Sequence, residues 1–459
     1  MDKNTVIGFV LIALVLIGFS WYNQPSAEQI EAQRKEDSIA AVIKENAAKK
    51  QQAEAAARKA QAEAAAKGDS SALFFSALNG SSQDIVLKND KVELTFSTKG
   101  GSISKAIIKG FENVDNSKNE VTLFDGKTQQ MNFMLAGKSE NIITQDLYFT
   151  PSNMSDSTVT MTALAGNGGS LVLAYTLGKD YMLHFSFQAN GLSGMFAPNY
   201  KQMDIEWNDL VRQQEKGFTF ENRYTSVTYK KANSGTKNLD ESSEEIDKQI
   251  EDQLDWVAFK NQFFSAALIS KDNFAGNALL TSIPQQKGSG YLKQMGAKLK
   301  TNFDPTGVTP SEFEMYIGPN DFRLIKDVEQ QSTFGKDLDL EQLVYLGWWL
   351  VRWINRWFTI YVFDWLTSWG FGMGIVLILI TLLLKVITFP MVKKSYMSSA
   401  KMRVLKPKLD EATKQYDKPE DQMKKQQEMM SLYSKYGVSP LGGCLPMLIQ
   451  FPIWMAMFF

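Results

Sequence analysis

Residues Ile375–Pro390 read IVLILITLLLKVITFP, an apolar helical run that contains a single charged side chain, Lys385. A cation inside a membrane-spanning helix costs roughly 2.5 to 3.5 kcal/mol on insertion scales, so such a residue marks a functional site by default. The run therefore predicts a membrane protein with a polar cavity in its membrane part.

Snorkelling is the alternative interpretation of Lys385. If the span extends from Phe371 to Met391, Lys385 lies only about 6 Å past its middle, and its long side chain can reach the cytoplasmic interface. However, Lys393 and Lys394 already occupy that interface one to two turns later. A polar cavity is the preferred interpretation, and snorkelling stays open.

The composition excludes several classes of chemistry. The chain has 459 residues, enough for two or three folded units, and its 49 basic and 50 acidic residues nearly cancel. One cysteine, Cys444, and one histidine, His184, exclude an internal disulfide and argue against a Cys/His metal site. No GxxxxGK[ST] nucleotide-binding loop occurs. We therefore expect no catalytic residues, no cofactor and no bound metal.

The N-terminal part contains an anchor and a spacer. Residues 1–24 include an apolar run, Val6–Trp21, without a convincing cleavage site after it, which predicts an uncleaved signal-anchor helix. Residues 25–84 are rich first in Ala, Glu, Gln and Lys and then in Ser, Gly and Asp. This composition predicts a solvated helical spacer followed by a flexible linker.

From Ile85 the hydrophobic period changes to two. Val92, Leu94 and Phe96 alternate with polar residues, and later runs flank the turn sequence GNGG, as in a hairpin. Similar runs recur to about Tyr316, and the helical segment DFRLIKDVEQQ follows. Residues 85–335 therefore predict an all-β sandwich with a C-terminal helix.

Residues 336–369 combine tryptophan and arginine in a helical pattern. Trp349, Trp353 and Trp357 recur every four residues with arginines beside them. This pattern is typical of an amphipathic helix that lies in the membrane interface, where the tryptophans act as anchors. A packed aromatic core is the alternative.

The last segments predict two spans joined by a helical hairpin. Residues 370–391 form the second transmembrane helix, 392–438 a polar αα-hairpin, and 439–459 the start of a third span. Residues 391–440 contain eleven basic and six acidic side chains, a net charge of +5. This excess places the hairpin in the cytoplasm. No base-reading motif accompanies the charges, so nucleic-acid recognition is not expected.

These segments predict a polytopic α-helical membrane protein with a large extracytoplasmic all-β (β-supersandwich) domain and a cytoplasmic helical hairpin. The N-terminus is then also cytoplasmic. Pro446 and Pro452 need neighbouring helices or water to compensate for lost hydrogen bonds, and nothing follows Phe459 to supply them. We therefore expect the sequence to be truncated at its C-terminus.

Several motifs resemble signatures of the YidC/Oxa/Alb family of bacterial membrane protein insertases. They are KNDKVELTFSTKGGSISKAIIKGF, WVAFKNQFFSAALI, YIGP, SYMSSAKMRVLKPKL and SPLGGCLPMLIQFPIW, spread over nearly the whole chain. The resemblance implies a non-enzymatic inner-membrane insertase and chaperone with a periplasmic β domain, acting alone or with the Sec translocon. The implied partners are nascent membrane proteins, the ribosome, Sec translocon components and the phospholipid membrane.

The resemblance also implies roles for particular residues. The cation of a polar substrate groove falls on Lys385, where family members typically carry arginine; lysine keeps the charge but lacks the planar fork of donors. Thr381, one turn earlier, matches a polar groove position, although its hydroxyl can instead bond to its own helix. The substrate-contact helix matches Gly442, Gly443, Pro446, Gln450 and Pro452.

Two other functions stay open. The exterior domain of the family resembles sugar mutarotases, which makes an envelope carbohydrate-binding or mutarotase-like protein one alternative. Such catalysis generally uses a histidine and carboxylate pair, but His184 alternates with the apolar Leu183 and Phe185, as a surface residue does. A structural membrane tether is the second alternative, and it predicts that loss of the groove residues is harmless.

Overall fold

The structure is a computed structural model that describes residues 73–114, 120–138, 140–197, 199–239, 245–414, 422–436 and 445–459. These residues form two compact units. The first comprises the described residues up to Asn320 together with Asp327–Asp339, and the second comprises Asp321–Lys326 and the described residues from Leu340 onward. The predicted anchor, residues 1–24, and the predicted spacer up to residue 72 lie outside the described residues.

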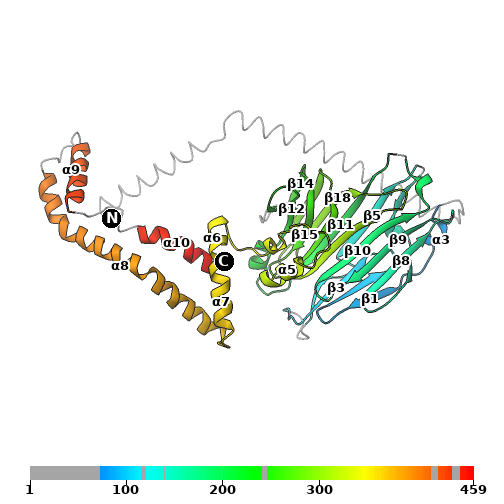
Figure 1. Ribbon diagram of the computed structural model, residues 1–459, viewed down its shortest axis with the longest axis horizontal. Coiled ribbons are helices and arrows are strands. Elements are labelled where there is room, and N and C mark those ends of the chain that lie inside the picture. Colours follow the sequence, from blue (N-terminus) through cyan, green and yellow to red (C-terminus); the bar gives the residue numbers. More distant parts are fainter. Residues whose placement is uncertain are drawn as a thin grey trace. The chain divides into compact units, whose positions relative to one another are not determined.

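The first unit is built from β-strands, which carry most of its residues (Figure 1). The strands are β1 (Asp84–Lys88), β2 (Val92–Ser97), β3 (Ile103–Lys109), β4 (Glu120–Phe124), β5 (Gln129–Ala136), β6 (Asn141–Ile143), β7 (Thr150–Ser152), β8 (Thr158–Leu164), β9 (Ser170–Leu177), β10 (Met182–Asn190), β11 (Gln202–Arg212), β12 (Ser226–Lys231), β13 (Thr236–Asn238), β14 (Ile246–Ile250), β15 (Leu254–Lys260), β16 (Phe264–Phe274), β17 (Ala278–Pro284), β18 (Tyr291–Asn302) and β19 (Ser311–Pro319).

The longest helices belong to the second unit. They are α3 (Phe75–Leu78), α4 (Phe218–Arg223), α5 (Phe322–Glu329), α6 (Trp349–Ile354), α7 (Ile360–Thr367), α8 (Met373–Thr413), α9 (Gln422–Lys435) and α10 (Leu445–Phe458), with the 3₁₀-helices η1 (Thr144–Asp146), η2 (Ser193–Met195) and η3 (Leu340–Leu343) and the π-helix η4 (Asn355–Thr359).

The strands form two sheets, which confirms the predicted all-β domain. One sheet has four strands in the order β1-β2-β3-β4, and the other has fifteen, with the main order β6-β5-β11-β18-β16-β19-β10-β9-β8-β7. Neighbouring strands pair antiparallel throughout. In β2, Val92, Leu94 and Phe96 are buried, as their alternation predicted. The hairpin around GNGG is the β8–β9 pair.

Aromatic side chains fill the interior of the large sheet. Phe133 on β5 stacks on Phe187 on β10 with ring centroids 5.1 Å apart, and Phe185 stacks on Phe313 of β19 at 5.0 Å. Large apolar rings give the domain a core of its own, because each buried ring removes a large apolar area from water.

Residues 73–83 differ from the flexible linker that the sequence predicted. They contain α3, and the side chains of Phe74 and Ala77 are buried against the sandwich. The amide of Tyr148 also donates a 2.6 Å hydrogen bond to the carbonyl oxygen of Ala77. The Ser- and Gly-rich composition concealed this contact, because composition does not show that a single aromatic side chain, Phe74, becomes buried against a distant part of the chain.

A segment that we call the strap, residues 331–339, holds the end of the first unit to the sandwich. Lys230 on β12 donates a 2.6 Å hydrogen bond to the carbonyl oxygen of Asp337. The indole nitrogen of Trp256 on β15 donates a 2.7 Å hydrogen bond to the carbonyl oxygen of Leu338. These buried donors fix the chain just before it enters the second unit.

The predicted interfacial segment, residues 336–369, is helical only in part. Residues 336–339 belong to the strap, and the continuous helix of α6, η4 and α7 begins at Trp349. Six aromatic side chains recur at every fourth residue and are each more than half exposed: Trp349, Trp353, Trp357, Tyr361, Trp365 and Trp369. This exposure contradicts the alternative of a packed aromatic core.

Helix α8 joins the predicted second span, residues 370–391, to the predicted hairpin from residue 392. It continues unbroken to Thr413 with Pro390 and Pro407 inside it. An internal proline costs about 3 kcal/mol because one backbone hydrogen bond is lost. Packing on both sides of Pro390, through the buried Thr388 and Leu405, offsets that cost.

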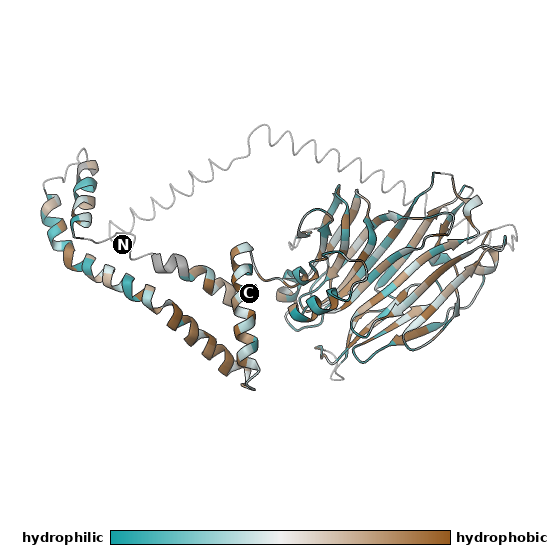
Figure 2. Ribbon diagram, in the orientation of Figure 1, coloured by the Kyte–Doolittle hydropathy of each residue, from teal (hydrophilic) through white to brown (hydrophobic). Residues whose placement is uncertain are grey.

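The first half of α8 is hydrophobic and the second half hydrophilic (Figure 2). Within the described residues, α8 is the one helix that is long and apolar enough to cross a membrane. The predicted hairpin corresponds to the second half of α8 and to α9, which pack together. The break predicted at the sequence YDKPED lies outside the described residues.

Candidate functional site

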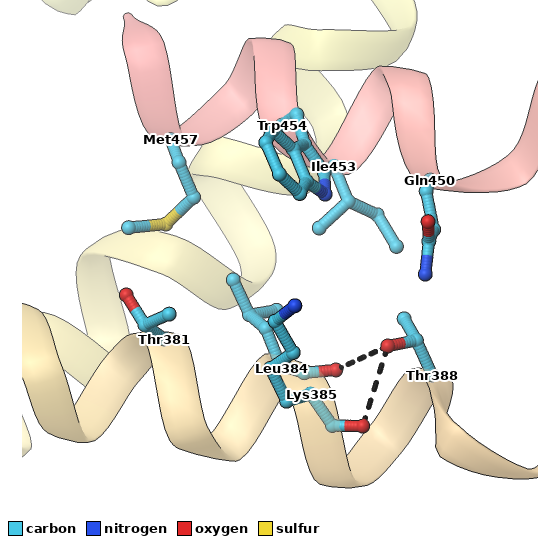
Figure 3. A pocket seen from close by; sticks show the side chains of 8 residues that line it. All are labelled: Thr381, Leu384, Lys385, Thr388, Gln450, Ile453, Trp454 and Met457. Atoms are coloured by element: carbon cyan, nitrogen blue, oxygen red, sulfur yellow. Dashed lines mark hydrogen bonds between the residues drawn. The ribbon is translucent and has the colours of Figure 1, made fainter. Parts of the chain in front are cut away.

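A pocket of about 190 Å³ lies between α8 and α10 (Figure 3). We call it the α8–α10 pocket. Its lining residues lie three or four apart on each helix, which places them on one face of that helix. They are Thr381, Leu384, Lys385 and Thr388 from α8, and Gln450, Ile453, Trp454 and Met457 from α10.

Two threonines line the α8 wall of the pocket. The hydroxyl of Thr381 donates a 2.8 Å hydrogen bond to the carbonyl oxygen of Leu377, and the hydroxyl of Thr388 does the same to Leu384. Each hydroxyl is thus satisfied within its own helix, which is the alternative that the sequence left open for Thr381. Each oxygen still has a lone pair with which it can accept a hydrogen bond from a guest.

Lys385 provides the positive charge of the pocket. Its side chain is exposed, and its amine points from α8 toward α10 (Figure 3). Among the described residues, Lys385 takes part in no ion pair. Gln450 and Thr388 face each other across the same pocket (Figure 3). This wall can therefore attract carboxylate or carbonyl oxygens, more strongly where the surroundings exclude water.

The end of the pocket away from Gln450 and Thr388 is mainly apolar, although Thr381 lies there beside Met457 (Figure 3). Leu366, Val376 and Ile380 form a buried cluster against which Leu384 and Met457 pack. Because Leu384 and Met457 also line the α8–α10 pocket, this cluster closes that end. The pocket thus changes from polar to apolar along its length.

A close contact at Gly347 fixes α10 beside α6. The ring of Phe459 lies edge-on to Tyr345 with centroids 5.2 Å apart. A Cβ atom at Gly347 would lie 2.6 Å from the side chain of Val351 and 3.0 Å from that of Phe459. Gly347 also has a φ of +89°, a conformation that favours glycine. A larger residue at this position would push α10 away from α6.

The pocket brings together Lys385, Thr381 and Gln450, which the sequence assigned to two separate groups of site residues. Sequence analysis did not identify Thr388 or Trp454. The sequence could have identified Thr388, because Thr381, Lys385 and Thr388 are four and three residues apart and therefore lie on the same face of a helix.

The other predicted site residues lie elsewhere. Pro452 lies in α10 but does not line the pocket, and Pro446 also belongs to α10. Gly442 and Gly443 lie outside the described residues. The predicted interfacial anchors Trp349, Trp353 and Trp357 lie on α6 and η4 and do not line the pocket.

His184 has a carboxylate partner that the sequence did not indicate. Its Nδ1 lies 3.1 Å from Oε1 of Glu314, whose side chain is fully buried. Glu314 also accepts hydrogen bonds from the hydroxyl of Ser332 and from the amide and hydroxyl of Thr333. Burial favours a higher pKa for Glu314, but the bonds from His184, Ser332 and Thr333 outweigh burial and hold its pKa below the usual value. The strap therefore covers the carboxylate of Glu314, so that no sugar can reach it, whereas the side chain of His184 stays 30% exposed.

Family models match two parts of the chain. Residues 84–361 match the YidC periplasmic domain, and residues 365–459 match the family described as 60Kd inner membrane protein. The two matches together extend over most of the described residues.

Close relatives match the whole chain. The membrane protein insertase YidC of Phocaeicola vulgatus is 50% identical over 461 residues, which covers 100% of this chain and 73% of the relative. The YidC insertase of Bacteroides fragilis strain ATCC 25285 is 46% identical, with the same coverage of both chains. A crystal structure of an active YidC insertase with its first transmembrane domain resolved is 19% identical, with a TM-score of 0.30, and covers 83% of this chain and 71% of that chain.

Proposed function

Since this chain belongs to the YidC family of membrane protein insertases, we propose that nascent membrane segments pass through the α8–α10 pocket. The protein is a membrane protein insertase, and nascent membrane proteins and the membrane itself are its partners. The observation that carries the proposal is that Lys385 and Gln450 line the same pocket from different helices. Neither belongs at the lipid-facing surface of a simple anchor, because polar side chains are costly there.

The two ends of the pocket suit the two parts of a substrate. A hydrophilic stretch next to a nascent span gains hydrogen bonds from Gln450 and attraction from Lys385. The apolar span itself contacts Ile453, Trp454 and Met457. Such a site lowers the cost of dehydrating the polar stretch, because the stretch exchanges water for protein partners instead of lipid.

We also propose a multi-pass topology in the bacterial inner membrane. The N-terminus and the hairpin of residues 392–438 are cytoplasmic, the β domain is periplasmic, and α6 to α7 lie in the interface. The net charge of +5 between residues 391 and 440 supports this orientation. The exposed Trp349, Trp353 and Trp357 support the interfacial position of the helix.

The ribosome and Sec translocon components are proposed as further partners. The basic hairpin supports the ribosome, because positive charge attracts the phosphates of RNA without a sequence-reading motif. The chain has no nucleotide-binding loop, so the energy for insertion must come from substrate burial, the membrane potential or a partner. The pocket is compatible both with insertion by this protein alone and with insertion together with the Sec translocon.

Substitution of Lys385 tests this function. We expect Lys385→Arg to keep insertion activity, and Lys385→Ala to lower insertion of a substrate with an acidic tail about fivefold, since a partly exposed ion pair contributes up to about 1 kcal/mol. A neutral-tailed version of the same substrate should insert normally. Lys393→Ala, on the same helix but outside the pocket, is the control. Equal yields for the two substrates in Lys385→Ala would exclude the role of the charge.

A further inference from the structure

The second half of α8 and the end of α9 enclose a second cavity, of about 370 Å³, that the insertion pocket does not explain. We call it the α8–α9 groove. Its walls are apolar except for two lysines. It is lined by Met397, Ala400, Lys401, Val404, Leu405 and Lys408 from α8 and by Tyr436, which directly follows α9.

Helix α9 packs beside the groove but does not fill it. Leu405 and Leu409 are buried with Met402 of α8 and with Met429, Leu432 and Tyr433 of α9. Apart from Leu405, which also packs under α9, the groove residues lie on the neighbouring face of α8, roughly a quarter of a turn away at about 100° per residue. Helix α8 therefore presents a second stripe, of apolar side chains and lysines, which α9 leaves uncovered.

The uncovered stripe has the spacing of a helix-packing surface. Met397, Lys401, Val404 and Lys408 follow one another at intervals of four, three and four residues, which is the repeat by which helices interlock. Val404 is 78% exposed and Met397 is 55% exposed. Together with Tyr436, which is 46% exposed, they form one apolar patch with lysines beside it. A contiguous exposed patch of this kind, unlike a single exposed side chain, indicates a binding surface.

The charges of the groove define its guest. Among the described residues, neither Lys401 nor Lys408 forms an ion pair, and the amine of Lys408 lies 5.5 Å from the ring centre of Tyr436. From the stripe and its two lysines, we propose that the groove binds an amphipathic helix of a partner protein, with apolar residues facing Val404 and acidic residues facing Lys401 and Lys408. The groove thus acts as a docking site for a protein partner, in addition to the insertion pocket.

The shape of the groove favours a helix over a lipid surface. A helix that lies on lipid presents a convex apolar face with basic residues along its flanks. Here Tyr436 and the α8 side chains form two walls, and a row of side chains from a third helix can enter between them. Because the groove is separate from the α8–α10 pocket, its binding can be measured without any insertion assay.

Peptide binding tests the proposal. The probe is a synthetic helical peptide of about five turns with a leucine stripe and glutamates beside it, added to the protein in nanodiscs of zwitterionic lipid. One control peptide carries lysines in place of the glutamates, and a second carries serines in place of the leucines. We expect only the acidic peptide with leucines to bind.

Variants of the protein locate the binding site. Val404→Asp should weaken binding of the acidic peptide at least about tenfold, because the guest can no longer bury apolar surface there. The double variant Lys401→Glu and Lys408→Glu should bind the lysine peptide instead of the acidic one. Lys406→Glu, on the opposite face of α8, should change binding less than about twofold.

Three results would overturn the proposal. The first is acidic-peptide binding that is the same in the double variant as in the original protein. The second is binding to vesicles of phosphatidylglycerol, but to no peptide, with the same dependence on Val404, which would identify a lipid surface. The third concerns Val404→Cys in a Cys444→Ala background. It is the result that this cysteine does not react with a thiol reagent and that the original protein binds no peptide. That result would mean that another part of the chain fills the groove.

Discussion

Nδ1 of His184 and Oε1 of Glu314 lie 3.1 Å apart, and the strap covers Glu314 through Ser332 and Thr333. The partners come from strands β10 and β19, which are neighbours in the large sheet. A histidine and carboxylate pair can serve catalysis, but here both carboxylate oxygens already accept hydrogen bonds from the chain. The pair therefore serves to fasten the strap to the domain.

Glu314 should make the exterior domain sensitive to acid. Its pKa is lowered in the folded state, so its contribution to stability is complete above the unfolded value of about 4.5 and is lost as the pH falls through the lower folded value. We expect Glu314→Gln to lower the free energy of unfolding by about 1 to 3 kcal/mol at pH 7, and the difference from the original domain to shrink below pH 4.5. Urea unfolding of the β domain at several pH values measures the free energy of unfolding of both variants.

Glu312→Gln is the matched control, because Glu312 lies on the same strand but is paired with Lys271 at the surface. Its effect should be small at every pH. A Glu314→Gln domain whose stability follows pH just as the original does would show that this carboxylate does not hold the strap.

Lys230 should be essential for holding the strap. Its amine lies 2.9 Å from Oδ2 of Asp255, and both side chains are less than 10% exposed. Removal of one member of a buried ion pair usually costs about 3 to 5 kcal/mol, because the other charge is poorly compensated. Lys336, whose amine lies 3.8 Å from Oδ1 of Asp255, compensates part of that charge, so Lys230→Met should cost about 3 kcal/mol, at the lower end of this range. Proteolysis within residues 331–339 should also become faster. Lys231→Met, which removes a more exposed pair with Asp252, should leave both measurements nearly unchanged.

Thiol labelling should report the topology. With Cys444 replaced by alanine, a cysteine at Ser431 should be protected in intact cells from a membrane-impermeant reagent, and a cysteine at Ser234 should react. In the proposed topology, positive charge between residues 391 and 440 keeps that side in the cytoplasm. Permeabilised cells, in which both positions react, provide the control, and the reverse labelling pattern would require the opposite orientation.

Deletion of the sandwich should leave insertion intact. The α8–α10 pocket is built from residues of the second unit alone, so a protein in which a flexible linker replaces residues 73–319 should still insert substrates. Deletion of residues 85–315 is a useful comparison. This deletion exposes Phe74 and Tyr316 to water, although both are buried in the intact domain. Because exposed aromatic side chains favour misfolding and degradation, we expect lower protein levels for this variant. Loss of insertion at normal protein levels would make the sandwich essential.

The sequence predicted local patterns better than contacts between distant residues. Alternation in β2 and the turn at GNGG follow from side-chain periodicity and turn chemistry, and both are present in the structure. Lys385 stands out in an apolar run for the same local reason. The strap has no such local signal, because Lys230 and Asp337 lie 107 residues apart and nothing in the sequence around them marks them as partners.

Helix α8 shows what a change in composition does not reveal. The sequence divided this stretch into a span, residues 370–391, and a polar hairpin from residue 392, whereas α8 runs unbroken through that boundary. Packing of Leu405 and Leu409 against α9 and of Ile380 beneath α7 stabilises the helix on both sides of that boundary. Contacts of this kind depend on which helices become neighbours, which one sequence does not reveal.

The π-helix η4 acts as a phase correction for the aromatic series from Trp349 to Trp365, while Trp369 follows the end of α7 at Thr367. Residues four apart on an α-helix drift by about 40° per step, so the four steps of this series would spread the rings over roughly 160° of the circumference. A π-turn takes up one additional residue and thereby returns about 100° of this drift. The five rings then stay within a sector of about a sixth of the helix. A helix with this correction can meet a flat boundary with all its rings at a similar depth.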